Sequence, residues 1–181
     1  MATTVRTLQN FIGGDWVEST GGSSREIVSP VTGEKLADVP DAGPEDIRRA
    51  AAAAREAQPR WAALSAWERA RVCHAVADLI EERKEEFARE LSLEQGKPYV
   101  AEAIPDIEET AENFRIAAED VKRMESAVIP SKDVNKRIIT FRKPNGVYAG
   151  ITPWNFPTLI PVELIAPGIA AGNVIWFMKG S

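Results

Sequence analysis

The segment formed by residues 146–178 constrains the fold most, because its pattern has the order strand, turn, helix, strand. We expect strands at about 146–152 and 173–178 and a helix at about 159–171 between them. The last five residues of the second strand are all apolar, which is typical of a parallel strand covered on both faces. A right-handed crossover brings the carboxyl ends of both strands to one sheet edge, where ligands of open α/β sheets bind.

Turn residues divide the first 40 residues into short strands. The pair Gly13-Gly14 lies between two short apolar runs, which predicts a hairpin. A second pair of strands is expected at 25–29 and 35–39, since a proline and further turn residues separate them.

Helical patterns follow between residues 43 and 125. Pro44 suits the first position of a helix, and Ser65 with Glu68 forms a capping box. The expected helices are 44–57, 65–95 with a break near Lys84, and 99–125 with a kink or restart at Pro105. The apolar faces expected on the second and third helices are Val72, Val76, Leu79 and Ile80, and then Ile107, Ala111, Phe114, Ala118 and Val121.

The β-rich residues 136–143 precede Asn145-Gly146, and the apolar run 147–152 follows. Asn-Gly between two such runs is a strong short-range hairpin signal. The sequence therefore predicts a hairpin over 136–152.

Composition narrows the class of protein. The net charge is -5, and basic residues alternate with acidic ones, so we expect no nucleic-acid partner. The apolar stretch 159–178 is interrupted by Glu163, Asn173, prolines and glycines, so we expect a buried helix and strand there and no membrane span. A single cysteine and no apolar leader at the start favour the cytoplasm.

Several single residues have structural interpretations. Cys73 lies within a helix beside Val72, which indicates a buried thiol. We expect His74 to be an exposed helical residue, because adjacent helical positions point about 100° apart and cannot form a Cys-His pair. Trp61, Trp67 and Phe114 are expected to be core or packing residues.

Asn155 is the most informative polar residue, and two roles are open to it. It follows a strand and precedes a helix, where a short polar side chain can cap free backbone amides. Alternatively, its side-chain amide points into the crevice at the sheet edge and donates a hydrogen bond to developing negative charge on a substrate oxygen.

Longer motifs indicate a family. The run 143–157, which contains Trp154-Asn155-Phe156-Pro157, and the run 166–173 resemble the aldehyde dehydrogenase superfamily. Residues 94–98, Glu-Gln-Gly-Lys-Pro, and 11–16, Phe-Ile-Gly-Gly-Asp-Trp, match family segments in the same order. The similarity covers essentially the whole chain. It implies an α/β fold in which N-terminal β-hairpins and helices lead into the first βαβ unit of a Rossmann-like parallel sheet, incomplete at the C-terminus.

The resemblance also implies roles for residues. Asn155 would be the asparagine that donates to the oxygen of the thiohemiacetal intermediate. The backbone of Ile151, Thr152, Pro153 and Trp154 would line the nicotinamide side of an NAD or NADP cleft, and Lys179 would meet the adenosine ribose. Gly180 stands where the family usually has proline, which loosens the placement of Lys179, and a solvated strand end is the other interpretation of that lysine. No G-x-G-x-x-G motif opens the βαβ unit.

For the intact protein the resemblance implies oxidation of an aldehyde to a carboxylic acid, as a homodimer or homotetramer, with no metal. The nucleophilic cysteine and the glutamate base of the family belong downstream of Ser181, so we expect the 181-residue chain alone to be inactive. The expected domains are 1–135, the N-terminal part of the cofactor-binding domain, 136–145, the start of an oligomerisation arm, and 146–181, the first βαβ unit. A non-catalytic module or fragment that pairs with other chains remains the alternative, because the last strand would be an uncovered edge.

Overall fold

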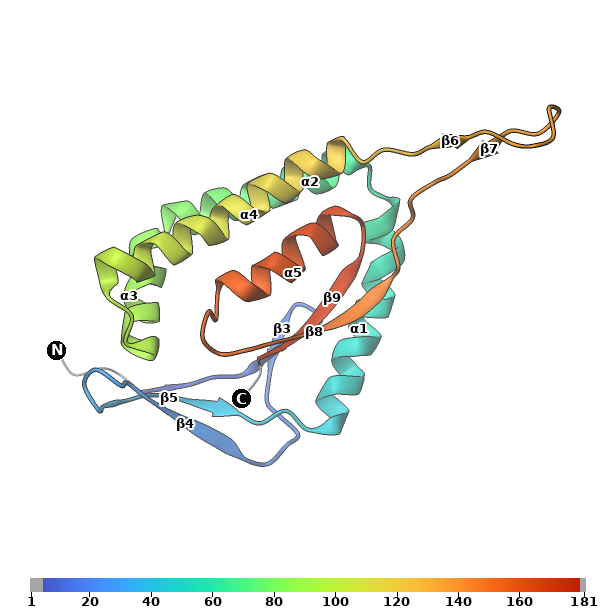
Figure 1. Ribbon diagram of the computed structural model, residues 1–181. Coiled ribbons are helices and arrows are strands. Elements are labelled where there is room, and N and C mark those ends of the chain that lie inside the picture. Colours follow the sequence, from blue (N-terminus) through green and yellow to red (C-terminus); the bar gives the residue numbers. More distant parts are fainter. Residues whose placement is uncertain (1–4, 180–181) are drawn as a thin grey trace.

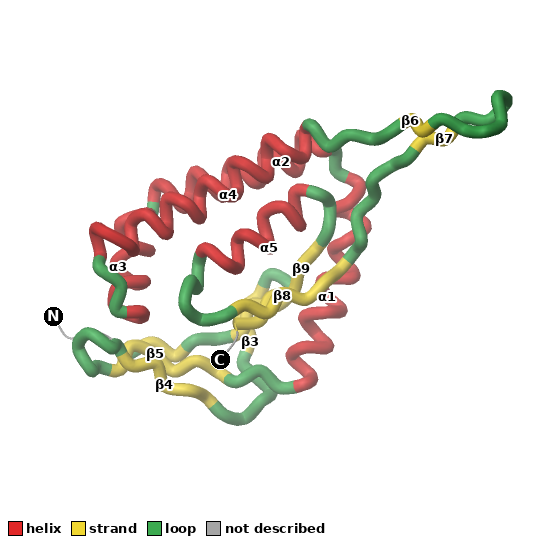
Figure 2. Tube along the Cα trace, in the orientation of Figure 1, coloured by secondary structure: helices red, strands yellow, loops and turns green. Residues whose placement is uncertain are grey.

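The computed structural model describes residues 5–179, with the backbone alone at Lys179. Its elements are mixed α and β, as the sequence predicts (Figures 1 and 2). In chain order they are β1 Arg6–Thr7, β2 Asn10–Ile12, β3 Asp15–Val17, β4 Ser24–Val28, β5 Lys35–Pro40, α1 Pro44–Ala63, α2 Ala66–Glu82, α3 Lys84–Gln95, the π-helical turn η1 Tyr99–Ala103, α4 Ile104–Lys122, β6 Val128–Ile129, β7 Ile138–Ile139, β8 Val147–Thr152, α5 Leu159–Ala170 and β9 Val174–Lys179.

The strands β8 and β9 with α5 between them form the predicted βαβ unit. The two strands are parallel, in unbroken register from Val147 beside Val174 to Thr152 beside Lys179. Both α5 and α1 contact the two strands, and α5 also packs on α4 (Figure 1). Full burial of β9 was a wrong expectation for this chain: Val174 to Trp176 and Met178 are half-buried, and Phe177 is 39% exposed.

The N-terminal strands follow the predicted turns. β2 and β3 form a hairpin in which Gly13 and Gly14 have positive φ angles of 68° and 99°, as a tight hairpin turn requires. β4 pairs antiparallel with β5. β1, which no sequence signal predicted, adds parallel to the other edge of β5.

The helices begin where their caps predict, but two end elsewhere. The side chain of Ser65 accepts from the amide of Glu68, and the Glu68 carboxylate accepts from the amide of Ser65, so α2 has its capping box. α1 continues past the predicted Ala57 to Ala63 with Pro59 inside it, and α4 ends at Lys122 rather than Glu125. The break near Lys84 and the restart at Pro105 are confirmed.

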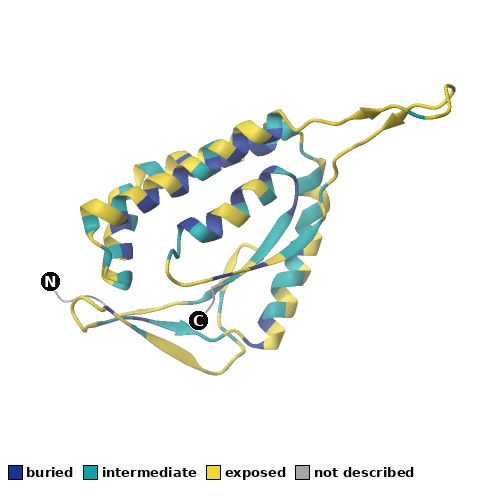
Figure 3. Ribbon diagram, viewed as in Figure 1, coloured by how far each residue is buried: buried dark blue, intermediate teal, exposed yellow. Residues whose placement is uncertain are grey.

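The main core lies where α2, α4 and α5 face one another, and these faces are dark blue in Figure 3. The predicted face of α4 is buried at all five positions. On α2 the expectation was partly wrong, because Val72 and Leu79 are exposed and the buried face is formed by the small residues Ala70, Cys73 and Ala77. Small side chains let two helix backbones approach closely, so this face is the one that packs. Trp67, expected to be a core or packing residue, is 64% exposed and so lies outside the core.

Residues 124–145, here called the arm, extend away from the body between α4 and β8 (Figures 1 and 3). The predicted hairpin over 136–152 is wrong. Ile138–Ile139 pairs instead with Val128–Ile129 upstream, and β8 pairs with β9. Gly146 does have a positive φ of 112°, but its carbonyl accepts from the amide of Val174, so this glycine opens the parallel ladder rather than a hairpin.

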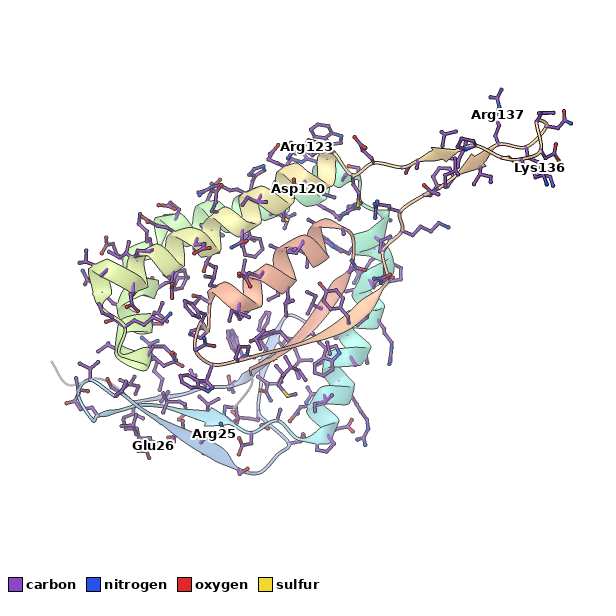
Figure 4. The ribbon with its side chains drawn as sticks, in the orientation of Figure 1. Arg25, Glu26, Asp120, Arg123, Lys136 and Arg137 are labelled. Carbon is purple, nitrogen blue, oxygen red and sulfur yellow. The ribbon has the colours of Figure 1, made fainter. Side chains whose placement is uncertain are left out.

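Most side chains of the arm are exposed to solvent. Val134 is 94% exposed and Phe141 is 74% exposed. Lys136 and Arg137 lie near its tip (Figure 4). In the part of the chain that the structure describes, no helix is both long and apolar enough to cross a membrane.

Candidate functional site

The candidate site lies where β8 and β9 end together. Thr152 and Lys179 are the last register partners, so the carboxyl ends of both strands meet at one edge, as predicted. Residues 153–158 then leave β8 and lead into α5. Ile151 and Trp154 are 64% and 59% exposed, whereas Thr152 is 3% exposed. A ligand at this edge would therefore meet the side chains of Ile151 and Trp154, but only the backbone of Thr152.

Asn155 stands in the connection between strand and helix, and its side chain is exposed. The interpretation of Asn155 as a helix cap is wrong, because α5 begins at Leu159 with Thr158 as its N-cap residue. Among the hydrogen bonds of residues 5–178, none involves the Asn155 side chain. A primary amide carries two N–H donors, so Asn155 can offer a donor to an oxygen that arrives from solvent.

Phe156, the neighbour of Asn155, contacts Lys97, a residue for which the sequence predicted no role. The ammonium nitrogen of Lys97 lies 3.7 Å from the centroid of the Phe156 ring. The same ammonium forms an ion pair with Asp106, and the two side chains are only 12% and 11% exposed. The available signal was the motif Glu-Gln-Gly-Lys-Pro at 94–98, which carried family resemblance but no assigned role.

Lys179 is placed only in part. Its backbone is the last residue of β9 and lies beside Thr152, whereas its side chain, like Gly180, is outside the described residues. The adenosine-ribose role expected for Lys179 therefore stays a prediction.

A hollow of about 1150 Å³ lies beside β9, between α1 and the N-terminal strands. Trp154 and residues 174–178 are part of its lining, together with alanines of α1. Trp154 therefore connects the strand-end loop to this hollow. Asn155 is not among the lining residues.

Cys73 and His74 do not form a catalytic pair. Cys73 is fully buried, and burial raises the pKa of its thiol, although nearby Arg69 opposes this rise. His74 is half-buried rather than exposed as expected, and its Nε2 lies 2.8 Å from the carboxylate of Glu119. A buried thiol with a raised pKa is a poor nucleophile, and the burial predicted for Cys73 is confirmed.

Comparison with known proteins decides the family. Residues 16–180 match the model of the aldehyde dehydrogenase family. The chain belongs to this family. The βαβ unit with its preceding helices is therefore an aldehyde dehydrogenase architecture, as the motifs at 94–98 and 154–157 indicate.

Three similar proteins show the extent of the match. The chain is 39% identical to the NADP(+)-dependent succinate-semialdehyde dehydrogenase of Escherichia coli, over 91% of this chain and 34% of that enzyme. It is 40% identical to the glutarate-semialdehyde dehydrogenase of Pseudomonas aeruginosa, with the same coverage. The crystal structure of PnpE in complex with nicotinamide adenine dinucleotide superposes with a TM-score of 0.90 at 37% identity, over 95% of this chain and 35% of that one. The chain thus spans about a third of the length of the relatives it matches.

Proposed function

We propose that the whole protein oxidises an aldehyde to a carboxylic acid with NAD or NADP, and that this chain supplies Asn155 and part of the cofactor cleft. The observation that carries the proposal is the Asn155 amide, exposed and without a hydrogen bond in the described structure, at the carboxyl edge of two parallel strands. Family membership supports it, since relatives are named as aldehyde-oxidising enzymes.

The reaction consumes an aldehyde, water and NAD(P)⁺ and yields a carboxylic acid, NAD(P)H and a proton. The cofactor supplies the hydride acceptor. Attack on the carbonyl carbon places negative charge on the carbonyl oxygen, and a preorganised donor lowers the barrier by stabilising that charge. The Asn155 amide is the donor of this chain, and the nucleophile and base come from the remainder of the protein.

The residues at the sheet edge fit a nicotinamide cofactor in chemical type. Ile151, Pro153 and Trp154 present exposed apolar surface at the strand end, which suits the flat nicotinamide ring. Thr152 contributes through its backbone, because its side chain is buried. Lys179 follows at the end of β9, where we propose that it binds the adenosine ribose.

The relatives narrow the substrates to test first. The two curated relatives described above are named for succinate semialdehyde and glutarate semialdehyde, which are aldehydes that also carry a carboxylate. We propose an ω-carboxylated aldehyde for this protein. Comparison with an uncharged aldehyde of the same length tests this, and equal kcat/KM for both would contradict it.

We further propose that the intact protein is a homodimer or homotetramer, joined in part through the arm. The arm carries exposed apolar side chains on a thin two-stranded ribbon, and a ribbon of this kind is marginal without a partner. We propose a division into 1–123 and 146–181, both in the cofactor-binding domain, with the arm, 124–145, between them. This boundary lies earlier than the expected 136, because β6 pairs with β7 within the arm.

The decisive experiment is Asn155→Ala in the intact protein, followed by aldehyde-dependent formation of NAD(P)H. Loss of an oxyanion donor is expected to lower kcat on the order of 10²–10³-fold with little change in KM. Asn145→Ala, an exposed asparagine before the other end of β8, is the matched control and should keep normal turnover. Unchanged kcat in Asn155→Ala would overturn the proposal, as would NAD(P)-linked turnover by the 181-residue chain alone.

A further inference from the structure

Lys97 occupies a constrained position after α3. Gly96 ends that helix with a positive φ of 76°, and a side chain there would meet Pro30. The hydroxyl of Ser92 donates a 2.7 Å hydrogen bond to the carbonyl oxygen of Lys97. The turn at Gly96 and the hydrogen bond from Ser92 therefore hold the backbone of Lys97, which fixes the position of its Cα atom.

The partner of Lys97 is equally fixed. Asp106 lies in the first turn of α4, just after Pro105, and its carboxylate accepts from the Lys97 ammonium. Between the two residues the chain forms η1, where the amides of Glu102 and Ala103 both bond to the carbonyl of Pro98. A short π-helical turn is uncommon and is frequent at functional sites. Here it sets Lys97 and Asp106 opposite each other.

A compact apolar cluster is formed by α3, η1 and α4, the elements that flank or carry this ion pair. It consists of Ala88, Leu91, Ala103 and Ile107, which are at most 4% exposed. The pair is therefore attached to packed helices and not to a solvated loop.

The face of Phe156 completes the environment of the ammonium. The negative face of an aromatic ring attracts a cation, and the attraction grows where water is excluded. The loop 153–158 has backbone hydrogen bonds at its C-terminal end, where the carbonyls of Phe156 and Thr158 accept from the first turns of α5. The Lys97 contact adds a side-chain attachment one residue from Asn155.

We propose that Lys97 is a positioning residue: its ammonium, oriented by Asp106, holds the ring of Phe156 and thereby sets the direction of the adjacent Asn155 amide. The catalytic consequence rests on the proposed function of Asn155, whereas the positioning of the Asn155 amide does not depend on that function. Charge is essential to it, because a neutral side chain would leave the buried Asp106 carboxylate unpaired and the ring without its cation.

NMR of the protein in the absence of substrate tests the positioning without turnover. Protons above an aromatic ring are shifted upfield, so the ε-methylene protons of Lys97 should resonate upfield of the other lysines. Phe156→Leu keeps the apolar volume and the ion pair but should abolish this shift and move the side-chain amide signals of Asn155. Phe141→Leu, at an exposed ring of the arm, is the matched control and should leave both sets of signals in place. Ordinary Lys97 shifts, or Asn155 signals that do not respond to Phe156→Leu, would overturn the proposal.

Kinetics of the intact protein test the consequence. Lys97→Met should lower kcat on the order of ten- to a hundredfold by misplacing the donor, with KM nearly unchanged. Lys97→Arg keeps a cation that can lie on the ring, and it should recover most of the loss. Equal losses in both variants would contradict positioning by charge. If the NMR result holds while Asn155→Ala turns over normally, the positioning stands and the proposed function fails.

Discussion

The Nε of Arg69 donates a 2.7 Å hydrogen bond to the carbonyl oxygen of Ala170, so a cation of α2 closes the last turn of α5. Arg69 is 7% exposed, and burial lowers the pKa of its guanidinium. The indole of Trp61 donates to the preceding carbonyl, that of Ile169, at 2.8 Å. A positive charge is favourable at a helix C-terminus, where the backbone carbonyls lack partners. These two side chains fix the end of α5 and hence the start of β9.

Replacement of Arg69 by methionine should therefore destabilise the chain. The substitution keeps the aliphatic stem but leaves the Ala170 carbonyl without its donor, which is expected to cost about 2–3 kcal/mol of unfolding free energy. Urea denaturation followed by circular dichroism measures this. Arg71→Met, at an exposed position on the same helix, should change stability little. Equal effects of the two variants would refute the role of Arg69.

Gly172, between α5 and β9, should tolerate no side chain. Its φ is 91°, and an added Cβ would lie 2.9 Å from Cγ of Pro144. Gly14 has a similar φ of 99° but open space around it. Gly14→Ala thus measures the backbone strain alone, and Gly172→Ala should cost about 1–3 kcal/mol more because of the steric overlap. The thermal unfolding midpoints of Gly14→Ala and Gly172→Ala measure this difference. Similar midpoints would show that Pro144 moves aside at little cost in free energy.

Acid should weaken the junction between the N-terminal strands and α1. Burial would raise the pKa of Asp46, but hydrogen bonds from the amides of Thr20 and Gly43 lower it from 3.8 to about 2. The unfolded chain therefore binds this proton more readily. The stabilisation is complete above pH 3.8 and is lost as the pH falls through about 2.

Asp46→Asn should remove this part of the pH dependence. Urea midpoints of the variant are expected to change less than those of the wild type across that pH range. Asp120→Asn, at the exposed pair with Arg123 near the end of α4, should follow the wild type (Figure 4). If the urea midpoint of Asp46→Asn fell in acid as much as that of the wild type, the assignment of this pH dependence to Asp46 would be disproved.

Cys73 should resist labelling in the native state. Its thiol is fully buried, and burial raises its pKa, so little reactive thiolate is available. A thiol reagent should react slowly with the folded chain and rapidly in denaturant. Fast reaction under native conditions would mean that α2 opens readily from α4 and α5.

The arm should determine the oligomeric state of the intact protein. The double substitution Ile139→Asp and Phe141→Asp places charge on its exposed apolar side chains and should lower the mass measured by light scattering. Leu79→Asp, an equally charged change at an exposed position of α2, is the control. An unaltered mass in the arm variant would exclude the arm as an essential contact.

Local signals were the part of the fold that the sequence could predict. Gly13-Gly14 encodes its own turn, and Ser65 with Glu68 encodes the start of α2, because the interacting groups lie within a few residues. The Asn145-Gly146 signal failed because strand pairing is decided by competition between distant partners, which a dipeptide does not contain.

The same limit applies to the site. Asn155 could be proposed from the sequence because one motif contains the whole signal, whereas the approach of Lys97 to Phe156 joins residues from two distant segments. The buried face of α2 was misjudged for a related reason. Large residues such as Leu79 carry the hydrophobic pattern, but small ones such as Ala77 allow close packing with α4.

Because β8 and β9 pair residue by residue, the candidate site should respond differently to odd and to even changes in the length of β8. Side chains alternate along a strand, and Ile151 points to solvent while Thr152 points inward. Deleting one residue from the middle of β8 would reverse this alternation at the strand end and send the chain toward Asn155 from the opposite face. Removing two would preserve the facing and shorten the approach by roughly 7 Å. Natural length variation in this strand should therefore come in pairs.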